Sequence, residues 1–179
     1  MERVFLIGYM GVGKTTIGKL LSKELGVQFI DLDKSIESRY HKTIQEIFAE
    51  KGEKKFRSIE RDMLREVATF ESVLIATGGG APCFYDNMDI MNQQGITIYL
   101  KASVDQLVMR LLASKNVRPI IQGKSPDELK SFVKAHLAER EVYYTKAKLT
   151  CLTEQLVTHK HVKAIVAIIR EMLEAETKS

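Results

Sequence analysis

Five short apolar runs, rich in β-branched and aromatic residues, recur along the chain and predict five β-strands. Each run is nearly continuous rather than alternating, which is typical of strands that are covered on both faces. After each of the first four runs, apolar residues return at intervals of three and four, the spacing of one helix face. The runs span residues 4–7, 27–30, 72–76, 96–100 and 148–152. Strands and helices are therefore expected to alternate.

Four helix faces stand out by their apolar positions. They comprise Ile17, Leu20, Leu21 and Leu25; Phe56, Ile59, Met63, Leu64 and Val67; Leu107, Leu111 and Leu112; and Val162, Ile165, Val166, Ile169 and Leu173. Strand–helix alternation produces a parallel sheet with helices on both faces and right-handed crossovers. We therefore expect a three-layer α/β fold in which helices flank a five-stranded parallel sheet. Ligands of such sheets bind beyond the carboxyl ends of the strands.

The composition is that of an ordinary globular protein. The chain has 179 residues, of which 45% are hydrophobic and 28% charged. We expect residues 1–179 to form a single domain, which suits this length. No apolar run approaches the roughly 18–20 residues that cross a bilayer, so we expect no membrane association. Cys83 and Cys151 are too few for a disulfide scaffold, which favours a reducing cytoplasm.

The net charge is modest. Basic residues exceed acidic ones by 27 to 23, a formal charge of +4. Proteins that bind nucleic acid usually gather Lys and Arg into a stripe or a patch. The densest basic run, residues 51–57, is followed by two acidic residues within five positions. We expect no nucleic-acid partner, and the charge alone leaves open a solvated helix face or a small anionic ligand.

Two segments are longer than the winding of strand and helix requires. Residues 33–71 lie between the second and third predicted strands, and residues 114–146 lie between the fourth and the fifth. Long insertions in a compact domain usually form lids or binding elements. We predict a substrate-binding insertion at about residues 33–62 and a lid at about residues 112–125.

The strongest motif is GYMGVGKT at residues 8–15, which fits the phosphate-loop pattern G-x-x-x-x-G-K-[ST] between a strand and a helix. Backbone N–H groups of such a loop surround phosphate oxygens, while Lys14 would reach the outer phosphates and Thr15 would offer its hydroxyl to Mg²⁺. The predicted nucleotide-binding residues here are Gly11, Val12, Gly13, Lys14, Thr15 and Thr16. An unrelated glycine-rich turn would match by chance at a rate on the order of 1% in such a chain. We therefore predict binding of a nucleoside triphosphate.

Asp31 and Asp33 follow the second predicted strand, in the run FIDLD. In an extended segment, residues two apart point to the same side, which would place both carboxylates beside a bound triphosphate. One could hold the metal directly or through water, and the other could accept a hydrogen bond from an attacking hydroxyl. Alternatively, Asp33 caps the helix that begins at residue 34.

Arg57 and Glu60 lie three positions apart on a predicted helix face and can pair. As a surface ion pair this contact would be worth little. Held by Glu60, however, Arg57 could bind the carboxylate of an anionic substrate in a bidentate manner. Three glycines at residues 78–80 follow the third predicted strand, where a ligand could meet bare backbone N–H groups. A flexible connector is the alternative for the glycines.

Six motifs in register make the sequence resemble the shikimate kinase family. They are the phosphate loop with Lys14, the pair Asp31 and Asp33, the F-R-x-x-E run at 56–60, the glycines at 78–80, Arg118-Pro119, and R-x-x-x-Y from Arg140 to Tyr144. The resemblance implies a P-loop NTPase fold similar to nucleoside monophosphate kinases. It also implies ATP-dependent phosphorylation of the 3-hydroxyl of shikimate, in aromatic amino-acid biosynthesis.

The resemblance further implies roles for individual residues. The catalytic residues would be Lys14, Asp33 and Arg118. The substrate would be held by Asp33, Arg57, Gly79, Gly80 and Arg140. Arg110 and Arg118 would join the phosphate loop in binding the nucleotide, and Thr15 and Asp31 would bind the metal. Arg110 would stack on the base, and Arg118 would swing onto the phosphates as the lid closes. Asp31 would assist Mg²⁺ through water. The implied ligands are ATP with Mg²⁺ and shikimate, and we expect a cytoplasmic monomer.

Two other functions remain open from the sequence. One is another small-molecule kinase of the same fold, acting on gluconate or on a nucleotide; the F-R-x-x-E run and the glycines disfavour it. The other is a regulatory nucleotide-binding protein without activity, which the full set of charged motif residues disfavours. The loop at residues 153–158 lacks the basic residue and the proline that are common there in the family.

Overall fold

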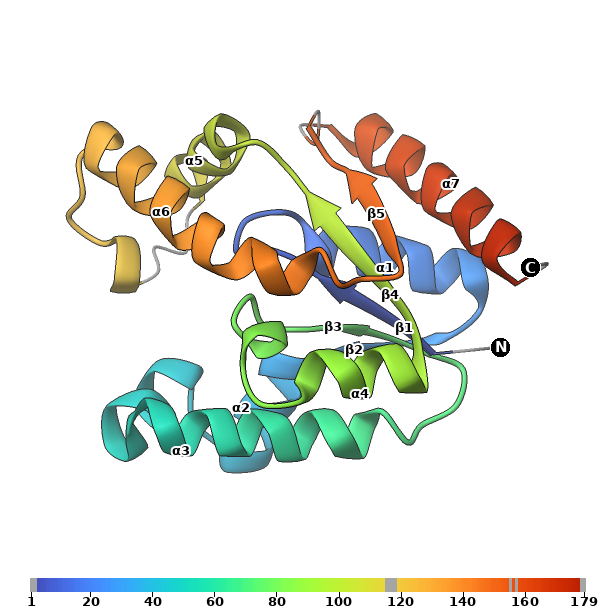
Figure 1. Ribbon diagram of the computed structural model, residues 1–179, viewed down its shortest axis with the longest axis horizontal. Coiled ribbons are helices and arrows are strands. Elements are labelled where there is room, and N and C mark those ends of the chain that lie inside the picture. The colour runs from blue at the N-terminus through green and yellow to red at the C-terminus, as the bar shows by residue number, and fades with distance from the viewer. Residues whose placement is uncertain (1–2, 115–118, 155, 157, 178–179) are drawn as a thin grey trace.

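A computed structural model of the chain describes residues 3–114, 119–154, 156 and 158–177. At its centre, five parallel strands form a sheet in the order β2-β3-β1-β4-β5 (Figure 1). The strands are β1 (Arg3–Ile7), β2 (Gln28–Asp31), β3 (Val73–Ala76), β4 (Gly95–Lys101) and β5 (Leu149–Leu152). Every predicted strand is confirmed, with its ends displaced by no more than one residue.

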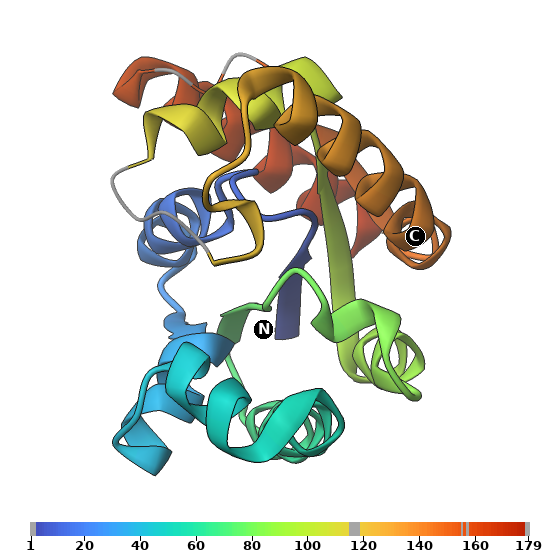
Figure 2. The same ribbon diagram turned by 90° about the vertical axis from the view of Figure 1, so that its left-hand side faces the viewer.

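Helices cover both faces of this sheet. They are α1 (Lys14–Leu25), α2 (Leu32–Tyr40), α3 (Ile44–Val67), α4 (Asn87–Gln94), α5 (Val104–Ala113), α6 (Pro126–Tyr144) and α7 (His159–Glu176), with short 3₁₀ helices η1 (Ala81–Cys83) and η2 (Pro119–Ile121). α1 contacts α7 on one face, while α4 and α6 lie on the other (Figure 2). The predicted three-layer α/β fold is confirmed. Within the described ranges, no helix is both long enough and apolar enough to cross a bilayer.

The core lies between the sheet and these helices. β3 is buried throughout, and β1 pairs on both sides, with Val4 opposite Leu74 on β3 and Ile96 on β4. The predicted helix faces pack into this core, with one correction. Leu112 was expected on the buried face of α5 but is 53% exposed. It lies five positions after Leu107, which is about 140° around a helix, so it cannot share that face.

The segment between β2 and β3 folds into α2 and α3, which contact each other. α3 begins with a capping box in which Thr43 and Glu46 satisfy each other's backbone N–H groups. Gly52 interrupts α3 with a φ of 74°, so α3 consists of two helical pieces joined at a kink. The second piece carries the apolar face of α3 and the F-R-x-x-E run.

The carboxyl ends of the strands meet at one edge of the sheet, and the loops that leave them carry the predicted site. β1 runs into the phosphate loop, β2 ends at Asp31, and β3 leads into the glycines at 78–80. β4 and β5 end close to Ser103 and Glu154 respectively. Residues from five separate parts of the chain are thereby gathered at a single edge.

Candidate active site

The phosphate loop closes around its own lysine. Lys14 Nζ donates to the carbonyl oxygens of Gly8 at 2.7 Å and Tyr9 at 3.0 Å. Gly8 has a φ of 140°, and a Cβ there would lie 2.5 Å from the carbonyl oxygen of Leu100, so only glycine fits. Residues 11–16 form the turn of the loop and the start of α1. The positive end of the α1 dipole and the Lys14 charge therefore meet where phosphates would bind.

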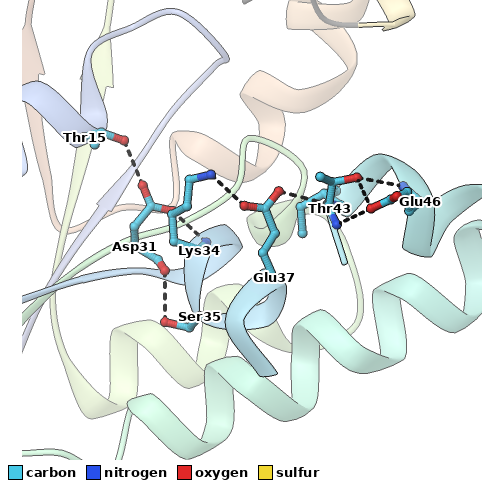
Figure 3. Close-up of polar contacts among 8 residues, drawn as sticks. Thr15, Asp31, Lys34, Ser35, Glu37, Thr43 and Glu46 are labelled. Carbon is cyan, nitrogen blue, oxygen red and sulfur yellow. Dashed lines mark hydrogen bonds and ion pairs between the residues drawn. The ribbon is translucent and has the colours of Figure 1, made fainter. Parts of the chain in front are cut away.

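Thr15 and Asp31 lie side by side between α1 and the end of β2 (Figure 3). Thr15 Oγ1 donates to Asp31 Oδ2 at 2.9 Å. This pair of oxygen donors fits Mg²⁺, which usually takes one or two protein oxygens and completes its shell with water and phosphate. Among the described residues, no group of three or more His, Cys, Asp or Glu side chains could hold a metal ion. A metal at this edge would therefore depend on the nucleotide for most of its ligands.

The two aspartates point in different directions, which corrects the prediction of a shared side. The strand ends at Asp31 and α2 begins at Leu32, so Asp33 lies in a helical turn and not in an extended segment. Asp31 Oδ1 accepts from the Lys34 backbone N–H at 3.2 Å and caps α2, so the suggested cap role of Asp33 is wrong. Asp33 faces the glycines instead, with Oδ1 2.8 Å from the place of a Cβ on Gly78.

A chain of polar contacts runs from Asp31 to the start of α3 (Figure 3). Lys34 Nζ lies 2.6 Å from Glu37 Oε2, and Glu37 Oε1 accepts from the Ile44 backbone N–H at 3.1 Å. The capping box at Thr43 continues this chain. These contacts hold α2 against α3, and the two helices carry Asp33 and Arg57.

Arg57 is buried between α3 and the glycine loop. Its Nη1 donates to Glu60 Oε2 at 2.8 Å, and the two residues are only 8% and 1% exposed. A Cβ on Gly80 would lie 2.6 Å from Arg57 Nη2, so the guanidinium in this position packs directly against bare backbone. Phe84 lies over the same group, 4.1 Å from the guanidinium carbon to the ring centre. The alternative of a surface ion pair is therefore wrong.

The electrostatics of this pair are those of a desolvated site. Burial raises the pKa of Glu60 to about 7, although the charges of Arg57 and Arg140 oppose the rise. Arg57 Nε is also buried, and within the part of the chain that the structure describes it has no hydrogen-bond partner. A buried unsatisfied donor costs roughly 1–3 kcal/mol. Such a donor is expected in an arginine that completes its contacts with an anionic ligand.

Arg140 reaches the glycine loop from α6. Its Nη1 lies 3.4 Å from the place of a Cβ on Gly79, and its guanidinium carbon lies 5.9 Å from the centre of the Tyr9 ring. One turn later, the Tyr144 hydroxyl donates to the Gly79 carbonyl oxygen. Burial raises the pKa of Tyr144 above its usual value, so the hydroxyl keeps its proton. The structure thus brings the predicted substrate-binding residues together around the three glycines.

On the nucleotide side, Arg110 of α5 contacts the backbone. It donates to the carbonyl oxygens of Thr153, of Glu154 at 3.1 Å and of Val12 at 3.4 Å, and burial lowers its pKa. Arg110 therefore joins the loop after β5 to the phosphate loop. Its stacking on an adenine base stays a prediction. The remaining predicted residue, Arg118, lies outside the described residues.

Two contacts of the site join residues that no sequence motif connects. The Glu154 carboxylate accepts from the Ser103 N–H at 2.6 Å and from the Ser103 hydroxyl at 2.8 Å, which ties the loop after β5 to the N-cap of α5. The Tyr9 hydroxyl lies 2.9 Å from His136 Nδ1. The partners are separated by 51 and 127 residues. Sequence patterns identify Ser103 as a possible helix cap, but they give no signal for either pairing.

A phosphate loop at a helix N-terminus, with a carboxylate and two arginines around a glycine loop, defines a P-loop kinase for a small anionic molecule. A family model described as shikimate kinase matches residues 10–173. The shikimate kinase of Parabacteroides distasonis is 54% identical over 173 residues, which cover 97% of this chain and 100% of that protein. The chain belongs to the shikimate kinase family.

Solved structures agree with this assignment. The crystal structure of shikimate kinase from Bacteroides thetaiotaomicron has a TM-score of 0.94 at 50% identity, covering 97% of this chain and 98% of that one. The structure of shikimate kinase from Acinetobacter baumannii in complex with shikimate has a TM-score of 0.84 at 31% identity, covering 98% and 94%. The fold around the site is therefore shared with relatives of both high and moderate identity.

Proposed function

We infer that this protein catalyses the reaction of its family, the transfer of the γ-phosphoryl group of ATP to the 3-hydroxyl of shikimate. The products are shikimate 3-phosphate and ADP, in the chorismate pathway to the aromatic amino acids. Beyond the family, one observation carries this function: the buried Arg57–Glu60 pair facing Gly80, with Arg140 beside Gly79. Two guanidinium groups next to bare backbone suit a small molecule with a carboxylate and several hydroxyls.

On the substrate side, Arg57 and Arg140 bind the shikimate carboxylate, and Glu60 holds Arg57 in place. The backbone N–H groups of Gly79 and Gly80 bind the substrate beside them. Asp33 meets the hydroxyls and accepts the proton of the attacking 3-hydroxyl as phosphoryl transfer proceeds. The position of Asp33 opposite Gly78 supports this role, because the place of a Cβ on Gly78 lies close both to Asp33 Oδ1 and to Glu60, the partner of Arg57.

On the phosphate side, Lys14 exchanges the carbonyl oxygens of Gly8 and Tyr9 for phosphate oxygens of ATP. A carbonyl oxygen is neutral, whereas a phosphate oxygen carries negative charge that attracts the Lys14 ammonium, so the exchange favours the bound state. Lys14 and the N-terminus of α1 then stabilise the charge that is spread over the transferred group. The backbone of residues 11–16 binds the phosphates, and Arg110 binds on the adenine side.

Thr15 and Asp31 are the residues that would hold Mg²⁺, Thr15 by its hydroxyl and Asp31 through a water molecule. When bound, the ion neutralises charge on the β- and γ-phosphates. The contact of 2.9 Å between the two side chains supports the assignment, because both oxygens can then approach the same ion.

Two segments of the chain complete the site. The substrate-binding insertion at about residues 33–62 contains α2 and much of α3, and it carries Asp33 and Arg57. The lid at about residues 112–125 carries Arg118, which closes onto the phosphates. A closed lid excludes water and so limits hydrolysis of ATP. We place the protein in the cytoplasm, as a monomer.

The function is tested by a coupled assay of ADP release with ATP and Mg²⁺, in the presence of shikimate, gluconate or AMP. We expect release that depends on shikimate and stops when EDTA removes Mg²⁺, and ³¹P NMR should identify the 3-phosphate. Release that is indifferent to shikimate but stimulated by gluconate or AMP would contradict the proposed function.

A further inference from the structure

Tyr9 of the phosphate loop touches both halves of the site. Its carbonyl oxygen accepts from Lys14, the lysine assigned to the phosphates. Its ring lies under Arg140, an arginine assigned to the shikimate carboxylate, at 5.9 Å from ring centre to guanidinium carbon. Tyr9 is only 1% exposed, so its side chain is packed in place although it belongs to a loop.

His136 is the neighbour that holds the hydroxyl end of this ring. It lies on α6, four residues and so about one helical turn before Arg140. Its Nδ1 is 2.9 Å from the Tyr9 hydroxyl, and the two rings meet edge to face at 82° with centres 5.6 Å apart. Phe132 also packs against His136, with ring centres 5.0 Å apart. Both Phe132 and Tyr9 thus hold the imidazole in place.

The surroundings favour the neutral form of this imidazole. Burial, and then the charge of Arg140, lower the pKa of His136 below its usual value, while Glu139 opposes the shift. A neutral imidazole with its proton on Nε2 can accept a hydrogen bond from the Tyr9 hydroxyl at Nδ1. It also places no second positive charge beside Arg140. Both properties suit a residue that supports the Tyr9 ring under the guanidinium.

We propose that His136 is a positioning residue for shikimate: by fixing the Tyr9 ring from α6, it sets the place of Arg140 above that ring. His136 contacts the Tyr9 hydroxyl, and the Tyr9 ring lies under the Arg140 guanidinium, so His136 positions Arg140 through Tyr9. An arginine over an aromatic ring gains a cation–π interaction, so its position follows that of the ring. The assignment of shikimate to Arg140 rests on the proposed function, whereas the placement of Arg140 by Tyr9 does not.

Three variants separate positioning from mere folding. His136→Leu removes the acceptor but keeps the bulk, His136→Asn retains an acceptor near the place of Nδ1, and Tyr9→Phe removes the hydroxyl while keeping the ring. Lys134→Leu, at an exposed position of the same helix, is the matched control for a change on α6. Dissociation constants for shikimate and for an ATP analogue are measured by calorimetry for all of them.

We expect His136→Leu and Tyr9→Phe each to weaken shikimate binding about tenfold, the size of one lost hydrogen bond. The double variant should be no weaker than either single one, because both remove the same contact. Binding of the ATP analogue should change less than twofold, and His136→Asn should recover most of the shikimate affinity. Equal losses for both ligands, or failure of His136→Asn to differ from His136→Leu, would overturn the proposal.

A second readout does not depend on shikimate. The ¹⁵Nε–¹Hε NMR signal of Arg140, assigned by its loss in Arg140→Lys, senses the ring current of Tyr9. We expect this signal to move in His136→Leu and to stay in place in His136→Asn and Lys134→Leu. An unmoved signal in His136→Leu overturns the positioning role even if shikimate binds. Conversely, a moved signal in a protein that neither binds nor phosphorylates shikimate would support the positioning role and contradict the proposed function.

Discussion

The proposed substrate side and the proposed nucleotide side of this site each contain an arginine, Arg57 and Arg110, and the hydrogen-bond partners of the two differ in kind. Arg57 is paired with a carboxylate inside the protein, and both partners are almost fully buried. Lys14 and Arg110 donate to neutral backbone carbonyl oxygens of the loops that we propose to bind the nucleotide. A buried ion pair is costly to separate, because either charge left alone is poorly solvated. Contacts to neutral carbonyl oxygens are weaker and can be exchanged.

The two sides therefore differ in how far they are formed before a ligand binds. The substrate side is preformed: Arg57, Glu60 and the glycines already occupy one arrangement, so little ordering is needed when a small anion binds. On the nucleotide side, the lysine must leave its carbonyl partners before it can reach a phosphate. Variants on the two sides should therefore differ both in size of effect and in which ligand they affect.

The largest effect is expected at Asp33, the proposed base of the reaction. Asp33→Asn keeps the shape of the side chain but removes the base, so kcat should fall roughly 10²- to 10⁴-fold while both ligands still bind. Steady-state kinetics and calorimetry measure the two quantities. Asp62→Asn, at an exposed position of α3, is the control. Near-normal turnover of Asp33→Asn would remove Asp33 from the chemistry.

Glu60 tests whether the substrate side is desolvated. The pKa of Glu60 is raised by burial from 4.5 to about 7, so the folded state binds more protons than the unfolded state between these values. Stability from this group is therefore present below pH 4.5 and is lost as the pH rises through 7, by about 3 kcal/mol in all. The free energy of unfolding, measured by urea denaturation from pH 4.5 to 8, should fall with this slope in the wild type and not in Glu60→Gln. The exposed neighbour Glu53→Gln should keep it; an unchanged slope in Glu60→Gln would contradict the desolvated pair.

Arg57 tests which ligand the substrate side serves. Arg57→Ala should weaken shikimate binding roughly 10²-fold, the size of a charge-assisted contact, and should leave binding of ATP nearly unchanged. Arg57→Lys keeps the charge beside Glu60 but not the bidentate geometry, so its shikimate affinity should lie between those of the wild type and Arg57→Ala. This variant also controls for misfolding. Arg61→Ala, which breaks a more exposed ion pair with Asp86, is the control. Equal losses for both ligands would end the distinction between the two sides.

The smallest effect is expected at the loop after β5. Glu154→Gln replaces two charge-assisted contacts to Ser103 with weaker ones, so the KM for ATP should rise about three- to tenfold, with the KM for shikimate unchanged. Ser103→Ala should act in the same direction. Glu139→Gln, an exposed acid on α6, serves as the control. If Glu154→Gln raised the KM for shikimate as much as that for ATP, the loop would not belong to the nucleotide side alone.

Most of the fold could be predicted from the sequence because its signals are local. Apolar runs predict the five strands, and the phosphate-loop motif lies between the first strand and the first helix. Errors arose where a prediction needed the boundary of an element. Asp31 and Asp33 were expected on one side because the strand was assumed to continue, whereas α2 begins between them and turns Asp33 toward the glycines.

The sequence by itself determined which charged residues this protein has and the short-range contacts they can make. Arg57 and Glu60 pair because they are three residues apart on one helix, and Lys14 contacts its own loop because it lies at the end of that loop. Only the tertiary structure decided that the Arg57 pair is buried, that Arg110 binds backbone carbonyl oxygens, and that Tyr9 meets His136. These depend on the parallel sheet, which brings the loops after its strands to one edge, and on α6, whose residues reach Tyr9 and the glycine loop at that edge. Contacts between such distant residues arise from packing, and packing leaves no period in the sequence.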